Sequence, residues 1–204
     1  MTDYTYLHDL VFKFSGTGIK TVTKTGATLV GHASFIAPEA WLNHMFKPLT
    51  LEELSILEEK LHRPIPEVYK DFLTNFSNGL NILNGHLSLH GLRYNYTRDL
   101  DNSQPFDLVI DNNYSSEKPT NATQEMFFFG SYLHGGARLY FDKDETICFC
   151  SKDDAFALKK WDNFEDMLIS EIIRIYGLFD DFGHPLKETH DLLGFISVNS
   201  EPNV

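Results

Sequence analysis

The sequence LTLEELSILEEKLHRPIPEVYKDFLTNFSNG, residues 49–79, decides the fold because it predicts two short amphipathic helices in succession. Thr50 can cap the first helix, and Glu53 stands three residues later, where a capping box requires an acidic side chain. Leucines then recur at i, i+3 and i+7, which gives this helix one apolar stripe.

The second helix of this stretch follows an Ile-Pro step. Pro66 suits the first position of a helix, because its missing N–H would have no partner there. Tyr69 and Phe72 begin an aromatic apolar face. Asn78-Gly79 then predicts the stop, since glycine readily adopts the left-handed conformation that ends helices.

The chain after residue 79 predicts strands and one more helix. Asn84-Gly85 suits a type I′ turn and predicts a β-hairpin. Further strands are expected at 125–129, 137–141 and 145–150, and a helix at 162–177. Residues 92–124 are polar and predict a loop apart from residues 106–110.

Both ends of the chain predict β-structure. Runs rich in β-forming residues at 4–14, 19–23 and 27–30 indicate a small meander before the helical pair, and residues 192–198 a final strand. The pattern as a whole predicts an α+β fold. We expect an antiparallel twisted sheet, packed by the helical pair before the main strands and by a helix after them.

Motifs for chemistry are absent or incomplete. Cys148 and Cys150 point to the same face of a strand, where a disulfide would be strained, and are interpreted as buried free thiols. His86 and His90 lack further ligands at metal spacing and are interpreted as solvent or hairpin-face residues. Ser131 has no nucleophile-elbow context. We therefore expect no catalytic residue, no metal and no cofactor.

The net charge of −12 is unevenly distributed. It is +1 for residues 1–48, −5 for residues 49–141 and −8 for residues 142–204. An acidic surface repels nucleic acid and anionic membranes and attracts basic partners, although acidity can also serve solubility alone. The candidate partner-binding residues are the acidic side chains of three turns: Asp142, Asp144, Glu145, Asp153, Asp154, Asp180 and Asp181.

The order and spacing of these signals resemble the SUKH superfamily, which contains the fungal cell-wall assembly regulators and many bacterial immunity proteins. The resemblance covers roughly residues 49–178. It is carried by the acidic helix, the aromatic helix, the Phe-Phe-Phe-Gly-Ser strand and the Trp-Asp-Asn-Phe helix start. Its structural motif residues are Pro66, Tyr69, Phe72, Asn78, Gly79, Gly130, Trp161 and Phe164. Because all of the aromatic residues among them lie on apolar faces, we expect Trp161 and Phe164 to be buried against the aromatic helix or against the sheet that it covers.

The resemblance implies a SUKH-like domain at 49–178. Outside the resemblance, we expect a β-rich extension at 1–48 packed on this domain and an acidic tail at 179–204. The resemblance also implies a non-enzymatic protein-binding domain, an immunity protein that occludes a cognate toxin, with a basic nuclease domain as one candidate partner. A regulatory or scaffold protein for cell-wall synthesis or signalling is the first alternative. An enzyme without a recognisable motif is the second. The start of the chain lacks a signal-like segment, so the cytoplasm is expected.

Overall fold

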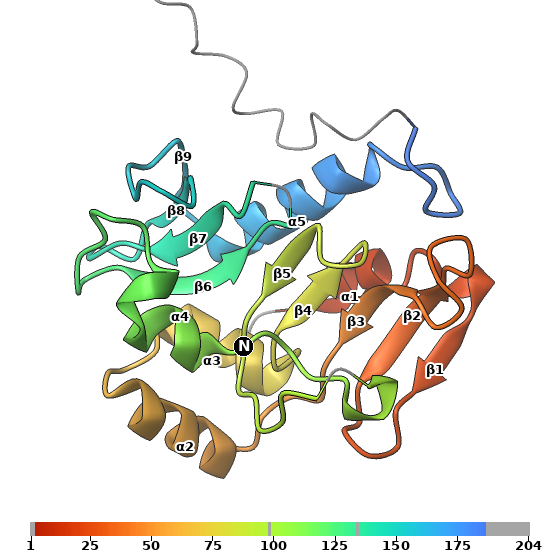
Figure 1. The fold of residues 1–204 in the computed structure, drawn as a ribbon, viewed down its shortest axis with the longest axis horizontal. Helices are drawn as coiled ribbons and strands as arrows, with labels where there is room; N and C mark the ends of the chain where they lie inside the picture. Colours follow the sequence, from red (N-terminus) through yellow and green to blue (C-terminus); the bar gives the residue numbers. More distant parts are fainter. Residues whose placement is uncertain (1–2, 98, 134, 187–204) are drawn as a thin grey trace, which may run out of the picture.

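The computed structural model describes residues 3–97, 99–133 and 135–186. In these ranges the strands form one nine-stranded antiparallel sheet whose spatial order follows the sequence, β1 to β9 (Figure 1). The strands are β1 (Ile19–Thr21), β2 (Thr28–His32), β3 (Trp41–Met45), β4 (Leu80–Ile82), β5 (Leu87–Leu89), β6 (Phe127–Ser131), β7 (Arg138–Phe141), β8 (Ile147–Cys150) and β9 (Lys159–Trp161).

Helices lie before, between and after the strands, as an α+β fold requires. They are α1 (Thr5–Val11), α2 (Leu51–Leu61), α3 (Glu67–Asn75), α4 (Leu108–Asn113) and α5 (Phe164–Tyr176), with short 3-10 turns at Ser15–Thr17, Leu100–Asn102 and Ser115–Glu117. All five helices contribute to one large core with one face of the sheet. The predicted fold class is therefore confirmed.

Aromatic rings fill the centre of this core. Tyr69 and Phe72 of α3 meet Phe164 of α5, with ring centroids 5.7 Å and 5.5 Å apart. Phe129 and Phe141 lie 4.5 Å apart on neighbouring strands β6 and β7 and contact the same cluster. Aromatic pairs at such separations add about 0.5–1.5 kcal/mol each beyond the area they bury. The predicted packing of Phe164 against the aromatic helix is confirmed.

The helical pair forms as the sequence predicts, with small shifts at its boundaries. Thr50 and Glu53 make both hydrogen bonds of the capping box. Pro66 is the N-cap of α3 rather than its first residue, and α3 ends at Asn75. Gly79 has the expected positive φ of 87°, but it lies four residues after the end of α3 and directly before β4, so it shapes the turn into β4 rather than stopping the helix.

The Asn84-Gly85 hairpin is confirmed, because β4 and β5 pair around it and both residues have positive φ. The strands expected at 125–129, 137–141 and 145–150 correspond to β6, β7 and β8 with their ends moved by up to two residues. The helix expected at 162–177 is α5. In the expected loop, residues 108–113 form α4.

The β-rich interpretation of residues 4–14 is wrong, since Thr5–Val11 is helix α1. Leu7 and Val11 are one helical turn apart, and both are buried in the core. Their burial favours a helix and outweighs the strand propensity of the neighbouring aromatic residues. The runs at 19–23 and 27–30 do form β1 and β2. Strand β3 was not expected. The expected strand at 192–198 lies outside the described residues.

Candidate functional site

The second face of the sheet carries a row of polar side chains. Starting from β3, the directly paired residues across five strands are His44, Asn81, Ser88, Ser131 and Arg138. Their strand neighbours point to the large core on the other face. Loops cover both ends of this row. A small cluster around Leu29 and Trp41 flanks one end, and another around Tyr140, Cys148 and Cys150 flanks the other.

A cavity of about 350 Å³ opens above the middle of this row. His44, Asn81, Ser88, Ser131 and Arg138 all line it. Ser88 is 1% exposed, and neither its Oγ nor Asn81 Oδ1 has a hydrogen-bond partner within the described chain. Buried polar atoms are nearly always paired in folded proteins. Two such oxygens on opposed residues of one cavity floor therefore identify a place that can receive a hydrogen-bonding group.

A β-bulge turns Ser131 into this cavity. The register of β6 against β7 shifts between Phe128 and Gly130, so Phe129 and Gly130 both lie on the core side. Without the extra residue, Ser131 would alternate onto the same face as Phe129. Gly130 is required here, because a Cβ would lie 2.8 Å from the backbone oxygen of Ser88. The bulge thus aims a serine at the cavity, a known use of bulges near functional sites.

Ser131 is held by a chain of side-chain hydrogen bonds. His90 Nε2 lies 2.9 Å from Ser131 Oγ, and His90 Nδ1 hydrogen-bonds Asp111 of α4. Since a carboxylate only accepts, Nδ1 carries the proton, and in the neutral ring Nε2 accepts from the serine hydroxyl. Arg138 donates to the other oxygen of Asp111 at 3.2 Å and lies 3.6 Å from Glu117. The interpretation of His90 as a solvent residue is therefore wrong, because it is 2% exposed.

The hydrogen-bonded residues Ser131, His90 and Asp111 are connected like a serine hydrolase triad, but the surrounding backbone differs from that of such an enzyme. In such enzymes the backbone N–H of the residue after the serine can help to bind the oxyanion. Here the N–H of Tyr132 is bonded to Ala137 O at 2.9 Å within the hairpin. The ring of Phe106 lies 5.5 Å from that of His90, which is buried. This chain of bonds orients Ser131 and fastens α4 to the sheet.

His44 adds a neutral imidazole to the cavity. Burial lowers its pKa to about 4, from the usual 6.5. Its Nδ1 lies 3.3 Å from Ser103 Oγ, in the segment that crosses this face of the sheet. The imidazole therefore contributes hydrogen bonding, and no charge, at physiological pH.

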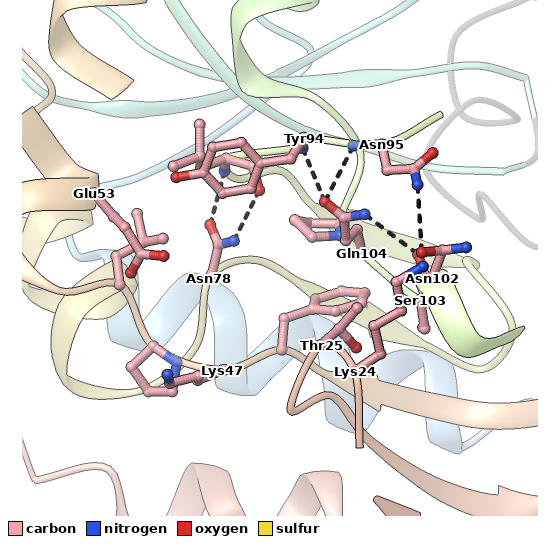
Figure 2. Close-up of a pocket in the computed structure, with 15 residues that line it drawn as sticks. Lys24, Thr25, Lys47, Glu53, Asn78, Tyr94, Asn95, Asn102, Ser103 and Gln104 are labelled. Atoms are coloured by element: carbon pink, nitrogen blue, oxygen red, sulfur yellow. Dashed lines mark hydrogen bonds between the residues drawn. The ribbon is translucent and has the colours of Figure 1, made fainter. Parts of the chain in front are cut away.

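A second cavity, of about 380 Å³, is lined in part by Ser103 and Gln104 of that segment (Figure 2). Asn78 bonds both the N–H and the C=O of Leu92 at its edge. Gln104 accepts from the backbone N–H groups of Tyr94 and Asn95, as the dashed lines in Figure 2 show. Asn78, part of the predicted helix stop, thus anchors the backbone of Leu92 at this cavity. Its polar atoms are already paired with the chain itself.

The predicted acidic residues fall into two groups. Asp142, Asp144 and Glu145 form the β7–β8 turn, while Asp153 and Asp154 lie in the β8–β9 connection. Asp142 Oδ2 is 4.0 Å from Cys148 Sγ, and the charge of Asp154 helps to raise the pKa of the Cys150 thiol, after burial as the main cause. Both segments therefore adjoin the same cluster on the cavity face.

The other two acidic residues, Asp180 and Asp181, lie elsewhere. Asp181 is 3.8 Å from Lys13, and the ring of nearby His184 lies 4.1 Å from that of Phe35, in the β2–β3 connection. In Figure 1 this segment lies at the right, beyond the end of α5. Asp180 accepts hydrogen bonds from the N–H groups of Phe182 and His184, which lower its pKa. The seven residues are not brought together in one surface.

The remaining predicted residues have structural positions. Cys148 and Cys150 are buried free thiols, as expected. Trp161 on the edge strand β9 packs against the large core but is only partly buried, and Lys159 Nζ lies 4.3 Å from its ring centre. Within the described ranges, no three His, Cys, Asp or Glu side chains are grouped to hold a metal ion.

The sequence did not reveal the polar row itself. Asn81, Ser88 and Ser131 stand in three separate strands, and only the pairing register places them side by side. A signal was present in each strand, since a polar residue interrupts an apolar run at 81 and 88. The bulge that redirects Ser131 has no comparable mark beyond Gly130.

Comparison with models of protein families gives a match to a large part of the chain. The model of the SMI1 / KNR4 family (SUKH-1) matches residues 48–170, more than half of the chain. No curated protein matches the sequence. Among the described residues, no helix is both long and apolar enough to cross a membrane.

Proposed function

Because the chain belongs to the SMI1/KNR4 family (SUKH-1), we propose that it is a non-enzymatic, cytoplasmic immunity protein that binds a cognate toxin domain and blocks its active site. The family match over residues 48–170 carries this proposal. The setting of Ser131 supports a binding role over a catalytic one, because the adjacent backbone donor is already bonded within the hairpin.

The charge favours a basic toxin domain, such as a nuclease. Nucleases bind phosphate and present cationic surfaces, which a chain of net charge −12 attracts. Electrostatic complementarity of this kind raises the association rate and specificity more than the final affinity. Regulation or scaffolding is the alternative, in which several partners bind modestly and none is toxic.

We assign the acidic contribution to the β7–β8 turn and the β8–β9 connection. Asp144 and Asp153 are largely exposed there, with side chains 73% and 79% accessible. They lie near Lys143 and Lys152, at 4.0 Å and 3.9 Å, so each is partly compensated. Asp180 and Asp181 are left out of this surface, because the structure places them beside Lys13 and the β2–β3 connection.

Co-expression tests the proposal. The tagged full chain is used to capture partners from its native host, and each captured protein is expressed alone and with the chain in a bacterial host. One partner that arrests growth alone, and does not when co-expressed, is the expected result. Several partners, none of them toxic, would favour the regulatory alternative and contradict neutralisation.

A further inference from the structure

We propose that the cavity above β3–β7 binds a side-chain carboxamide, that of an Asn or Gln presented by the protein partner. The inference rests on the proposed protein-binding function and adds the chemistry of one contact. Its starting point is the pair of unpartnered oxygens, Ser88 Oγ and Asn81 Oδ1, on the cavity floor. Leaving a buried polar atom without a partner costs about 1–3 kcal/mol. A ligand that forms hydrogen bonds with both oxygens removes this cost, which increases its affinity.

The two oxygens differ in the hydrogen bonds that they can form. Asn81 Oδ1 can only accept, whereas the hydroxyl of Ser88 can also donate. The residues are directly opposed in the β4–β5 register, so both side chains emerge side by side on one face. A carboxamide offers N–H donors and a C=O acceptor on one planar group. It can therefore satisfy both atoms at once.

The charges around the cavity disfavour ions. A carboxylate has no hydrogen to give Asn81 Oδ1. An ammonium group could donate to both oxygens, but it would approach the positively charged Arg138 guanidinium, which also lines the cavity. Arg138 is itself held by Asp111 and Glu117, so little net charge is left for an anion. His44 is neutral at physiological pH. The site is therefore built for an uncharged group.

Apolar side chains at the rim fit the remainder of such a ligand. Phe106 and Leu133 both line the cavity and are 49% and 58% exposed, which is high for large hydrophobic residues. The cavity of about 350 Å³ is larger than a carboxamide alone requires, so it also has room for the adjoining methylene groups and backbone. A few polar atoms at the base with apolar side chains around them match the pattern of a ligand pocket, in which the polar groups fix the orientation of the bound group.

The test uses propionamide as the probe and the full chain, followed by ¹H–¹⁵N NMR. We expect saturable shifts at Asn81, Ser88 and Ser131, with half-saturation at about 10 mM for so small a ligand. Propionate, propylammonium and 1-propanol are size-matched probes for an anion, a cation and a hydroxyl group. We expect each to bind at least about fivefold more weakly. No saturable shift at these residues, or binding of a matched probe as tight as that of propionamide, would overturn the proposal.

Variants locate the binding. Ser88→Ala and Asn81→Leu should each weaken propionamide binding at least about fivefold, while Ser55→Ala, on the exposed face of α2, should leave it unchanged. Ser88→Ala should not lower the midpoint of thermal unfolding, because the hydroxyl it removes has no hydrogen-bond partner among the residues that the structure describes. Unchanged propionamide binding in both cavity variants would place the probe elsewhere and refute the assignment.

The outcomes separate this proposal from the proposed function. Propionamide binding at the cavity, together with no toxin neutralised, would overturn the immunity function and keep the chemistry of the site. If both cavity variants still neutralise the toxin in full and the wild type does not bind propionamide, the cavity proposal alone is overturned.

Discussion

At the scale of single residues, His44 shows how a position in the sheet sets a protonation state. It stands in the polar row beside Asn81, and burial lowers its pKa to about 4. In the unfolded chain the same imidazole titrates near 6.5. Between these two values the unfolded state binds more protons than the folded state, so acid favours unfolding there.

The free energy of unfolding should therefore fall with acidification through this window. Its His44-linked part is fully present above pH 6.5 and is lost as the pH falls towards 4. Between pH 7 and pH 4.5 we expect the wild type to lose about 2 kcal/mol more than His44→Gln. Urea unfolding of both proteins at the two pH values measures the difference. Equal losses in both proteins would show that His44 does not titrate with a depressed pKa.

Gly79 stands at a position where the backbone conformation permits only glycine. Its φ is 87°, and a Cβ would lie 2.7 Å from both Leu89 O and Pro105 Cβ. The left-handed conformation alone costs a residue with a side chain about 1–2 kcal/mol, and the clash adds to this. We expect Gly79→Ala to lose more than about 2 kcal/mol in urea unfolding.

Gly16→Ala is the matched control for this substitution. No atom lies within 4 Å of a Cβ at Gly16, so its stability should change by less than about 0.5 kcal/mol. Similar losses for both variants would mean that the turn at Gly79 does not constrain the chain.

At the scale of elements, the sequence predicts those whose periodicity is strong and local. The helical pair, the Asn84-Gly85 hairpin and the long apolar face of α5 were all evident. Helix α1 was missed because its aromatic and β-branched residues favour strands, while the contacts of Leu7 and Val11 that decide it lie in the core. The cavity was missed for a related reason. Its residues meet only through strand register and a bulge, which no local pattern encodes.

The capping box of α2 gives a prediction about one element. Thr50 Oγ1 accepts from the Glu53 N–H at 3.2 Å, and Glu53 Oε2 accepts from the Thr50 N–H at 2.9 Å. Thr50→Ala removes one of these bonds and should destabilise the protein by about 1 kcal/mol. Thr50→Ser, which keeps the hydroxyl, should stay within about 0.5 kcal/mol of the wild type in urea unfolding. Equal losses for the two variants would exclude the cap as the cause.

At the scale of the whole molecule, the acidic charge belongs to two separate places, and the structure allows them to be tested against each other. Asp144→Lys with Asp153→Lys reverses charge beside β8, whereas Asp181→Lys reverses it near Lys13. We expect the first change to slow association with a basic partner, by about tenfold at low salt, and the second to have a smaller effect.

The slowing should shrink as salt rises, because exposed charges are screened beyond about 10 Å at 0.1 M. Stopped-flow association with the captured partner at several salt concentrations measures it. A salt-independent change, or an equal effect of Asp181→Lys, would mean that the β7–β9 side is not the surface that steers the partner.

The order of the sheet also bears on how the chain is made by the ribosome. Each strand pairs with the strand synthesised immediately before it, so the sheet can grow in the direction of translation. Loop closure is short for most of these pairs, which favours fast assembly, whereas β3 joins β4 through α2 and α3, and β5 joins β6 through the segment that contains α4. The core face cannot be covered in the same way. The ring contacts of Phe129 and Phe141 with Phe164 can form only after the last helix, which begins at Phe164, has been synthesised. A nascent chain that stops before α5 therefore exposes an aromatic sheet face, and a chaperone that recognises apolar surface should hold it until residue 176 has emerged.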